Sequence, residues 1–146
     1  MTIRIGTLAL VLGLAAHPGS AQTAADSAAL RTMALDYIDG WYSGDAERME
    51  RALHPHLAKR LVHVDPQGKS RLVDLTALEL VQSTRAGYGK TAAAERREDV
   101  TILDIFGNAA VVKVDASTWV DYLEAIRWNG RWVIVNVVWE NRPKSK

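Results

Sequence analysis

The sequence contains no cysteine. This absence excludes disulfides as a source of stability and excludes a lipid attached through a thiol. An excess of one charge is also lacking, because 18 basic residues stand against 17 acidic ones. Such a balance argues against nucleic acid as a partner and against a polybasic arm that binds membranes. Stability must therefore come from a buried apolar core, and the chain is long enough to form one.

A long hydrophobic run is lacking too, since crossing a bilayer takes about 20 apolar residues. The apolar run Leu8–Ala16 is shorter, and it follows a single positive charge at Arg4. Small residues at Gly19 and Ala21 fit the pattern that signal peptidase recognises. We therefore expect cleavage after Ala21, export to the periplasm or the medium, and no stable membrane anchor. The mature chain, Gln22–Lys146, would have 146 − 21 = 125 residues and form a single domain.

The first half of the mature chain is predicted to be mainly helical. Apolar residues recur there at the spacing of one helix face, and a Thr-x-x-Glu capping box marks the start of a later helix. A glycine, Gly44, marks the end of the first helix, and His54-Pro55 marks the end of the second. The predicted elements are a helix over 22–43, a short helix from Asp45 to His54, a strand over 60–64 and a helix from Thr76 to near Gly87.

The second half is predicted to form two β-hairpins, after a loop over 88–96. Gly107-Asn108 and Asn129-Gly130 are two-residue turn sequences, and each lies between apolar stretches of strand length. The predicted strands are 100–106, 109–118, 119–128 and 131–141. A two-residue turn fixes the register, so we expect Glu124 to face Val135 and Tyr122 to face Val137.

Both faces of the last hairpin are largely apolar, which is unusual for an antiparallel sheet with one face in water. One face should cover the helices, and a second copy of the chain is the simplest cover for the other. The sequence therefore predicts a homodimer. The residues expected on the outer face are Val112, Leu123, Ala125, Ile134 and Val138.

The order of elements resembles the nuclear-transport-factor-2-like superfamily. Four stretches also resemble its branch described as "Putative lumazine-binding": residues 36–45, residues 52–55, residues 121–123, and residues 128–136 around Trp-Asn-Gly-Arg-Trp. The resemblance implies an α+β fold, in which N-terminal helices pack against a curved antiparallel sheet that forms a cone. It also implies a small-molecule ligand, such as a lumazine-like heteroaromatic, inside the cone, but it supplies no catalytic residues.

The candidate ligand-binding residues are aromatic or polar side chains expected to point into the cone. Glu124 is the most informative, because a carboxylate among apolar neighbours must take up a proton or find a partner. Arg127 and Arg131 are alternative partners for it at the rim. The full set is Tyr37, Trp41, His63, Tyr122, Glu124 and Trp139. The histidines lack the spacing of a metal site, and neither a metal nor a cofactor is indicated.

Two other functions stay open at this point, and the first is an enzyme of isomerase, cyclase or dehydratase type that uses Tyr37 and Glu124. Steroid isomerases of the same superfamily use a tyrosine and a carboxylic acid as an oxyanion hole, and Tyr37 and Glu124 stand at the matching positions. Ungapped counting, however, places Leu61 where those enzymes have their catalytic base. The chain could instead be a protein–protein adaptor whose cone is filled by its own side chains.

Overall fold

The computed structural model describes residues 18–143, with side chains from residue 24 onward. Two helices are followed by a β-hairpin, a third helix and then four more strands. The elements are α1 Pro18–Ser43, α2 Ala46–Ala52, β1 Leu53–Val64, β2 Ser70–Thr76, α3 Ala77–Arg85, β3 Glu98–Phe106, β4 Ala109–Ala116, β5 Trp119–Trp128 and β6 Arg131–Asn141, with a 3-10 turn at Ala93–Glu95. This is the α+β class expected from the sequence.

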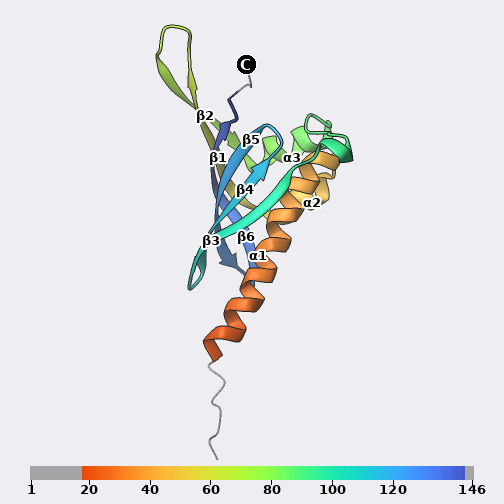
Figure 1. The fold of residues 1–146 in the computed structure, drawn as a ribbon, viewed down its shortest axis with the longest axis vertical. Coiled ribbons are helices and arrows are strands. Elements are labelled where there is room, and N and C mark those ends of the chain that lie inside the picture. Colours follow the sequence, from red (N-terminus) through yellow and green to blue (C-terminus); the bar gives the residue numbers. More distant parts are fainter. Residues whose placement is uncertain (1–17, 144–146) are drawn as a thin grey trace, which may run out of the picture.

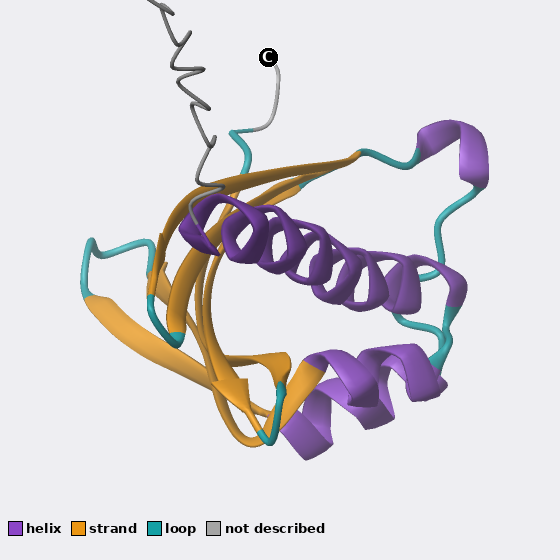
Figure 2. Ribbon diagram, turned by 90° about the horizontal axis from the view of Figure 1, so that it is seen from below, coloured by secondary structure: helices purple, strands orange, loops and turns teal. Residues whose placement is uncertain are grey.

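The six strands form one sheet in the order β2-β1-β6-β5-β4-β3. Neighbouring strands are antiparallel except β1 and β6, which run parallel. β-Bulges interrupt β3 and β6, and such bulges bend a sheet. The sheet curves around α1, with α2 and α3 beside it (Figure 2). The first and last strands of the chain are thus neighbours in the middle of the sheet.

The core lies between α1 and the inner face of the sheet. α1 ends where Tyr42 donates to the carbonyl of Arg97 at 3.0 Å and accepts from the amide of Ser117 at 2.9 Å. These bonds fix the helix to the start of β3 and the turn after β4. The fully buried core residues include Leu30, Ile38, Met49, Val112, Val114, Leu123, Ile134 and Val137.

The predicted N-terminal leader, residues 1–21, falls mostly outside the described residues. α1 begins at Pro18, four residues before the helix predicted from the sequence. Among the described residues, no helix is long and apolar enough to span a membrane. Cleavage after Ala21 and export stay predictions.

β1 and β2 differ most from the sequence prediction. β1 has twelve residues where five were expected, and β2 was not predicted. Pro55 misled the prediction, because proline normally interrupts a strand. It is accommodated because pairing with β6 shifts between Leu53 and Ala58. Beyond Arg60, where the pairing of β1 with β6 ends, β1 and β2 extend as an arm from the rest of the sheet (Figure 1).

The faces of the last hairpin are opposite to those expected. Ala125 pairs with Ile134 as predicted, but the bulge at Val135 places Glu124 opposite Asn136 and Tyr122 opposite Val138. Four of the residues expected on the outer face, Val112, Leu123, Ala125 and Ile134, are core residues. Of that set, Val138 alone is exposed. Because both faces carry apolar side chains, apolarity could not distinguish the inside from the outside.

Two carboxyl groups lie close together between α1 and β3. A hydrogen bond with Asp39, followed by burial and the negative charge of Asp39, raises the pKa of Glu98 to about 7, although Arg96 and Arg48 oppose the shift. Burial favours protonation of Asp39, but hydrogen bonds with Glu98 and Arg48 outweigh burial and lower its pKa. The pair is therefore most stable with a proton on Glu98.

Replacement of Glu98 by glutamine should change how stability depends on pH. The ordinary pKa of Glu98 is 4.5, so its stabilising contribution is complete below that value and is lost as the pH rises through about 7. The Glu98→Gln protein should therefore gain stability relative to the unaltered protein between about pH 5 and 8. Because water screens the pair, we expect a gain below about 1 kcal/mol. Urea unfolding across this range measures it, and the exposed Glu95→Gln should show no such trend.

Candidate ligand-binding site

A lysine and an aspartate form an ion pair inside the fold. Lys59 is on β1 and Asp121 on β5, and their strands are separated by β6. Asp121 is completely buried and Lys59 is 6% exposed. The ammonium Nζ donates to Oδ1 of Asp121 in a short contact. Burying two charges costs several kcal/mol each unless further hydrogen bonds satisfy them.

Neighbouring side chains provide those hydrogen bonds. Lys59 Nζ also donates to the hydroxyl of Tyr37 at 2.6 Å, and that hydroxyl donates to Oδ2 of Asp121 at 3.2 Å. The indole Nε1 of Trp119 donates to the same oxygen at 2.5 Å. Nζ lies 4.8 Å from the ring centroid of Trp139, a cation–π contact. The aspartate thus accepts three hydrogen bonds, and the lysine has one N–H left beyond its two polar contacts.

Burial dominates the protonation behaviour of this cluster. Burial, and then the charge and hydrogen bond of Asp121, raise the pKa of Tyr37 well above its ordinary value. Burial lowers the pKa of Lys59, and Asp121 partly offsets this. The hydroxyl of Tyr37 therefore stays protonated at neutral pH. Lys59 keeps its proton because Asp121 offsets part of the effect of burial.

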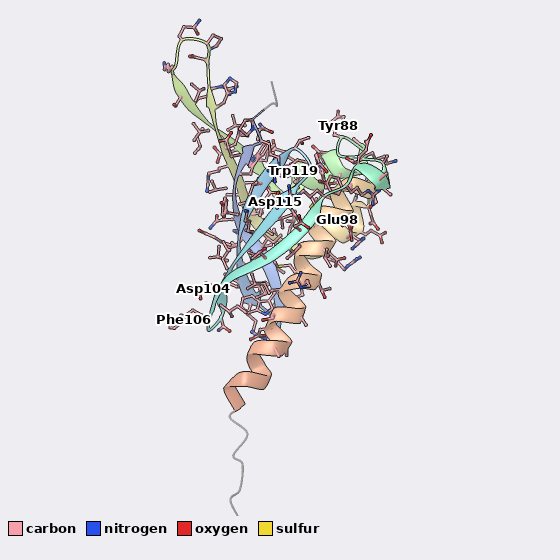
Figure 3. The ribbon with its side chains drawn as sticks, viewed as in Figure 1. Tyr88, Glu98, Asp104, Phe106, Asp115 and Trp119 are labelled. Carbon is pink, nitrogen blue, oxygen red and sulfur yellow. The ribbon has the colours of Figure 1, made fainter. Side chains whose placement is uncertain are left out.

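The cluster borders a cavity of about 380 Å³. Its wall is formed by α1, β1, β2, β5, β6, the loop after α3 and the turn before β5. In Figure 3, Tyr88 of that loop and Trp119 at the start of β5 lie at the same end of the molecule. The lining residues are Tyr37, Trp41, Lys59, Leu75, Tyr88, Gly89, Lys90, Thr91, Thr118, Trp119, Trp139 and Asn141. Five of these twelve residues are aromatic, and Lys59 lines the floor of the cavity with its partner Asp121 buried beneath it.

The loop after α3 is held closely against α1. A side chain at Gly89 would place its Cβ 2.3 Å from the indole of Trp41, so only glycine allows this contact. Gly44 and Gly87 both have positive φ and leave room for the aliphatic stem of Lys90. The rim of the cavity is thus shaped by three glycines, one tryptophan and one lysine.

Three of the six predicted ligand-binding residues line this cavity: Tyr37, Trp41 and Trp139. The other three do not. Tyr122 is 46% exposed on the outer face. Glu124 lies on that face as well, where its carboxylate accepts a hydrogen bond from Asn136 at 2.9 Å. His63 is exposed on the arm, opposite Arg71.

The expectation that Tyr122 and Glu124 point into the cone is therefore wrong. The pairing of Tyr37 with Glu124 as an oxyanion hole is wrong for the same reason, because the sheet lies between them. The arginines proposed as rim partners of Glu124 are engaged elsewhere, Arg127 with Asp26 and Arg131 with the carbonyl of Arg51. The described residues contain no group of three or more potential metal ligands.

Sequence reasoning missed the two charged residues of the floor. The signal was present, because on a strand Asp121 shares one face with Leu123 and Ala125, and Lys59 shares one with Leu57. A charged residue on an otherwise apolar strand face requires a partner of opposite charge. Asp121 was assigned to the family motif alone, and Lys59 lay just before the predicted strand over 60–64, in a segment without a predicted element.

Comparison with known proteins shows similarity at two levels. A family model described as "Putative lumazine-binding" matches residues 25–140. Similar solved structures include an NTF-2-like protein of unknown function from Silicibacter pomeroyi, with 21% identity, a TM-score of 0.65, and coverage of 82% of this chain and 98% of that chain. An NTF2-like protein of unknown function from Methylobacillus flagellatus has 21% identity and a TM-score of 0.65, with coverage of 82% of this chain and 94% of that chain. At these identities the structures establish the fold alone, and no curated protein matches the chain.

Loss of one partner of the buried ion pair should destabilise the protein strongly. Lys59→Met leaves Asp121 buried without its counter-charge, which typically costs about 3–5 kcal/mol. Replacing both charges, as Lys59→Met with Asp121→Asn, should recover part of that loss. Urea unfolding measures both variants. Arg60→Met is the matched control, because it removes an exposed ion pair with Asp74 from the next position of β1 and should cost less than about 1 kcal/mol. Equal losses for Lys59→Met and Arg60→Met would contradict the role of the buried pair.

Proposed function

The chain belongs to the Putative lumazine-binding family, a branch of NTF2-like proteins, and from this premise we propose that it binds a small aromatic molecule in the cavity above Lys59 and Asp121. The observation that carries the proposal is the open cavity itself. A charged pair at the floor of an aromatic hollow is costly to maintain as packing alone. Binding sites in proteins combine an apolar wall with a few placed polar groups, as here.

The size and chemistry of the cavity support a single flat ligand. A volume of about 380 Å³ lies at the lower end of the usual range for small-molecule sites, roughly 300–1,000 Å³. The indoles of Trp41, Trp119 and Trp139 can stack on or meet the edge of a planar ring. The family description names lumazine, which is a planar heteroaromatic of this kind. Binding of such a ring is our first expectation.

The same cavity argues against the adaptor alternative. An adaptor with a filled cone needs no polar groups at the base of an open hollow. Here the side chains of Tyr37 and Lys59 border open space at the floor. We therefore place the function inside the cone instead of on its surface.

Ligand binding should be visible in the protein's own fluorescence and stability. Titration with lumazines, pterins and flavins should quench tryptophan emission, since three of the five tryptophans line the cavity. A ligand at about 100 times its dissociation constant should add about 2.7 kcal/mol, which shifts the melting temperature by roughly 3–8 °C. Trp139→Leu should weaken binding, whereas Trp128→Leu, outside the cavity, should not. A well-folded protein with no response to any of these compounds would contradict the proposal.

We also propose that the mature chain acts outside the cytoplasm as a dimer. The leader sequence supports export. Pairing is supported by the outer face of the sheet, where Tyr122 and Val138 lie opposite each other and are 46% and 63% exposed. Two large apolar side chains side by side are a natural centre for a contact between copies.

A charge placed at this contact should separate the copies. We expect sedimentation velocity to give a dimer for the unaltered chain and a monomer for Val138→Lys, because a buried unpaired charge opposes association. Leu78→Lys is the control, since Leu78 is equally exposed but lies on α3. If the unaltered chain is a monomer even at high concentration, the proposed dimer is contradicted.

A further inference from the structure

The cavity contains positive charge without accessible negative charge. Its lining includes Lys59 at the floor and Lys90 at the rim, and none of the described residues that line it is acidic. Asp121 balances Lys59, but its carboxylate is completely buried beneath the floor. A ligand in the cavity therefore meets ammonium groups and aromatic rings and no carboxylate.

The two lysines differ in what they can offer. Lys59 is already neutralised by Asp121, and its remaining N–H can donate to a neutral acceptor. Lys90 is exposed and forms no ion pair within the part of the chain that the structure describes. Its charge is therefore available to a ligand.

The side chain of Lys90 packs against two glycines, Gly44 and Gly87. A Cβ at Gly44 would lie 2.7 Å from Cε of Lys90, and one at Gly87 would lie 3.2 Å from its Cδ. Both glycines have positive φ, +75° and +79°, which side-chain-bearing residues rarely adopt. The stem of Lys90 thus lies in a slot between the end of α1 and the loop after α3, beside the cavity mouth.

Desolvation determines which end of a ligand lies at which lysine. An anionic group pushed to the floor would lose its water and gain only a lysine that is already paired. At the rim the same group keeps part of its hydration and meets an unpaired ammonium. A neutral acceptor such as a hydroxyl or carbonyl oxygen suits the floor, since it costs less to desolvate.

From this arrangement we infer that the ligand is an aromatic acid, bound with its anionic group at Lys90, its ring among the indoles and a neutral acceptor at Lys59. The inference rests on the proposed function and adds the charge and orientation of the ligand. A neutral heteroaromatic would use the walls and floor but not the rim.

A matched pair of probes tests the charge directly. 6-Hydroxy-2-naphthoate carries a carboxylate and a hydroxyl at opposite ends of two fused rings, and 6-hydroxy-2-naphthamide replaces the carboxylate by a neutral group of similar shape. Titrations followed by tryptophan fluorescence should give the acid a roughly fivefold to tenfold lower dissociation constant, the size expected for one partly screened charge pair. This preference should shrink as salt is raised.

Replacement of Lys90 separates the inference from the proposed function. Lys90→Gln should bring the acid-to-amide ratio close to one, chiefly by raising the dissociation constant of the acid. Lys69→Gln is the matched control, because it removes one exposed positive charge from the turn of the β1–β2 arm. If acid and amide bind equally in the unaltered protein, and Trp139→Leu weakens both, the cavity binds aromatic rings and the charge assignment is overturned. If neither probe binds while a neutral heteroaromatic does, the aromatic-acid class is overturned and the proposed function stands.

Discussion

The ion pair between Lys59 and Asp121 ties together parts of the chain that are far apart in sequence. Lys59 reaches across β6 from β1, Asp121 reaches back from β5, and Tyr37 joins them from α1. Since a buried pair usually contributes little net stability, its value lies in permitting one arrangement and penalising others. A slip of β1 by one residue would turn Lys59 to the outer face and leave Asp121 alone in the core. The pair thus specifies both the register of β1 and the floor of the cavity.

The cone differs between its two ends. Around Leu123 and Val112 the inner face of the sheet is part of the buried apolar core that it shares with α1. Near Lys59 the helix and the sheet are joined by the hydrogen bonds of Tyr37, Lys59 and Asp121, and the rings of Trp119 and Trp139 border the cavity. The proposed binding site therefore lies where polar contacts join the helix and the sheet.

Much of the fold follows from the sequence, and the limits are physical. Helix periodicity, the capping box at Thr76 and the Asn129-Gly130 turn are local signals, and the structure has an element or turn at each of them. β2 was missed because strand pairing on an exposed arm leaves almost no apolar pattern. The inner face of β5 was assigned wrongly because alternation tells which residues share a face but not which face is buried. Only tertiary contacts decide which face is buried. Here Asp121 is buried and its neighbour Tyr122 is exposed, although aspartate is usually the more exposed residue type.

The site could be predicted in part for the same reason. Tyr37 and Trp41 lie on a long helix whose buried face is unambiguous, and they line the cavity. Glu124 was favoured because the predicted register placed it among apolar side chains and because isomerases have a carboxylic acid at the matching position, but the observed register places it opposite Asn136 on the outer face. Lys59 and Asp121 could have been found by asking why two residues of opposite charge lie on the apolar faces of two different strands. The bulge at Val135, which shifts the last strand by one position, has no signal in the sequence.

The parallel pairing of β1 with β6 has a consequence for the order of folding. β1 ends at residue 64, yet its neighbour in the sheet begins at residue 131 and is the last element of the chain. The helices and the two C-terminal hairpins can form through contacts between near neighbours, but the β1–β2 arm has no place to attach until β6 exists. Closure of the cone therefore requires that β6 has left the ribosome. A chain that stops before residue 131 would lack a central strand, so even a short C-terminal truncation would leave two separate pieces of sheet.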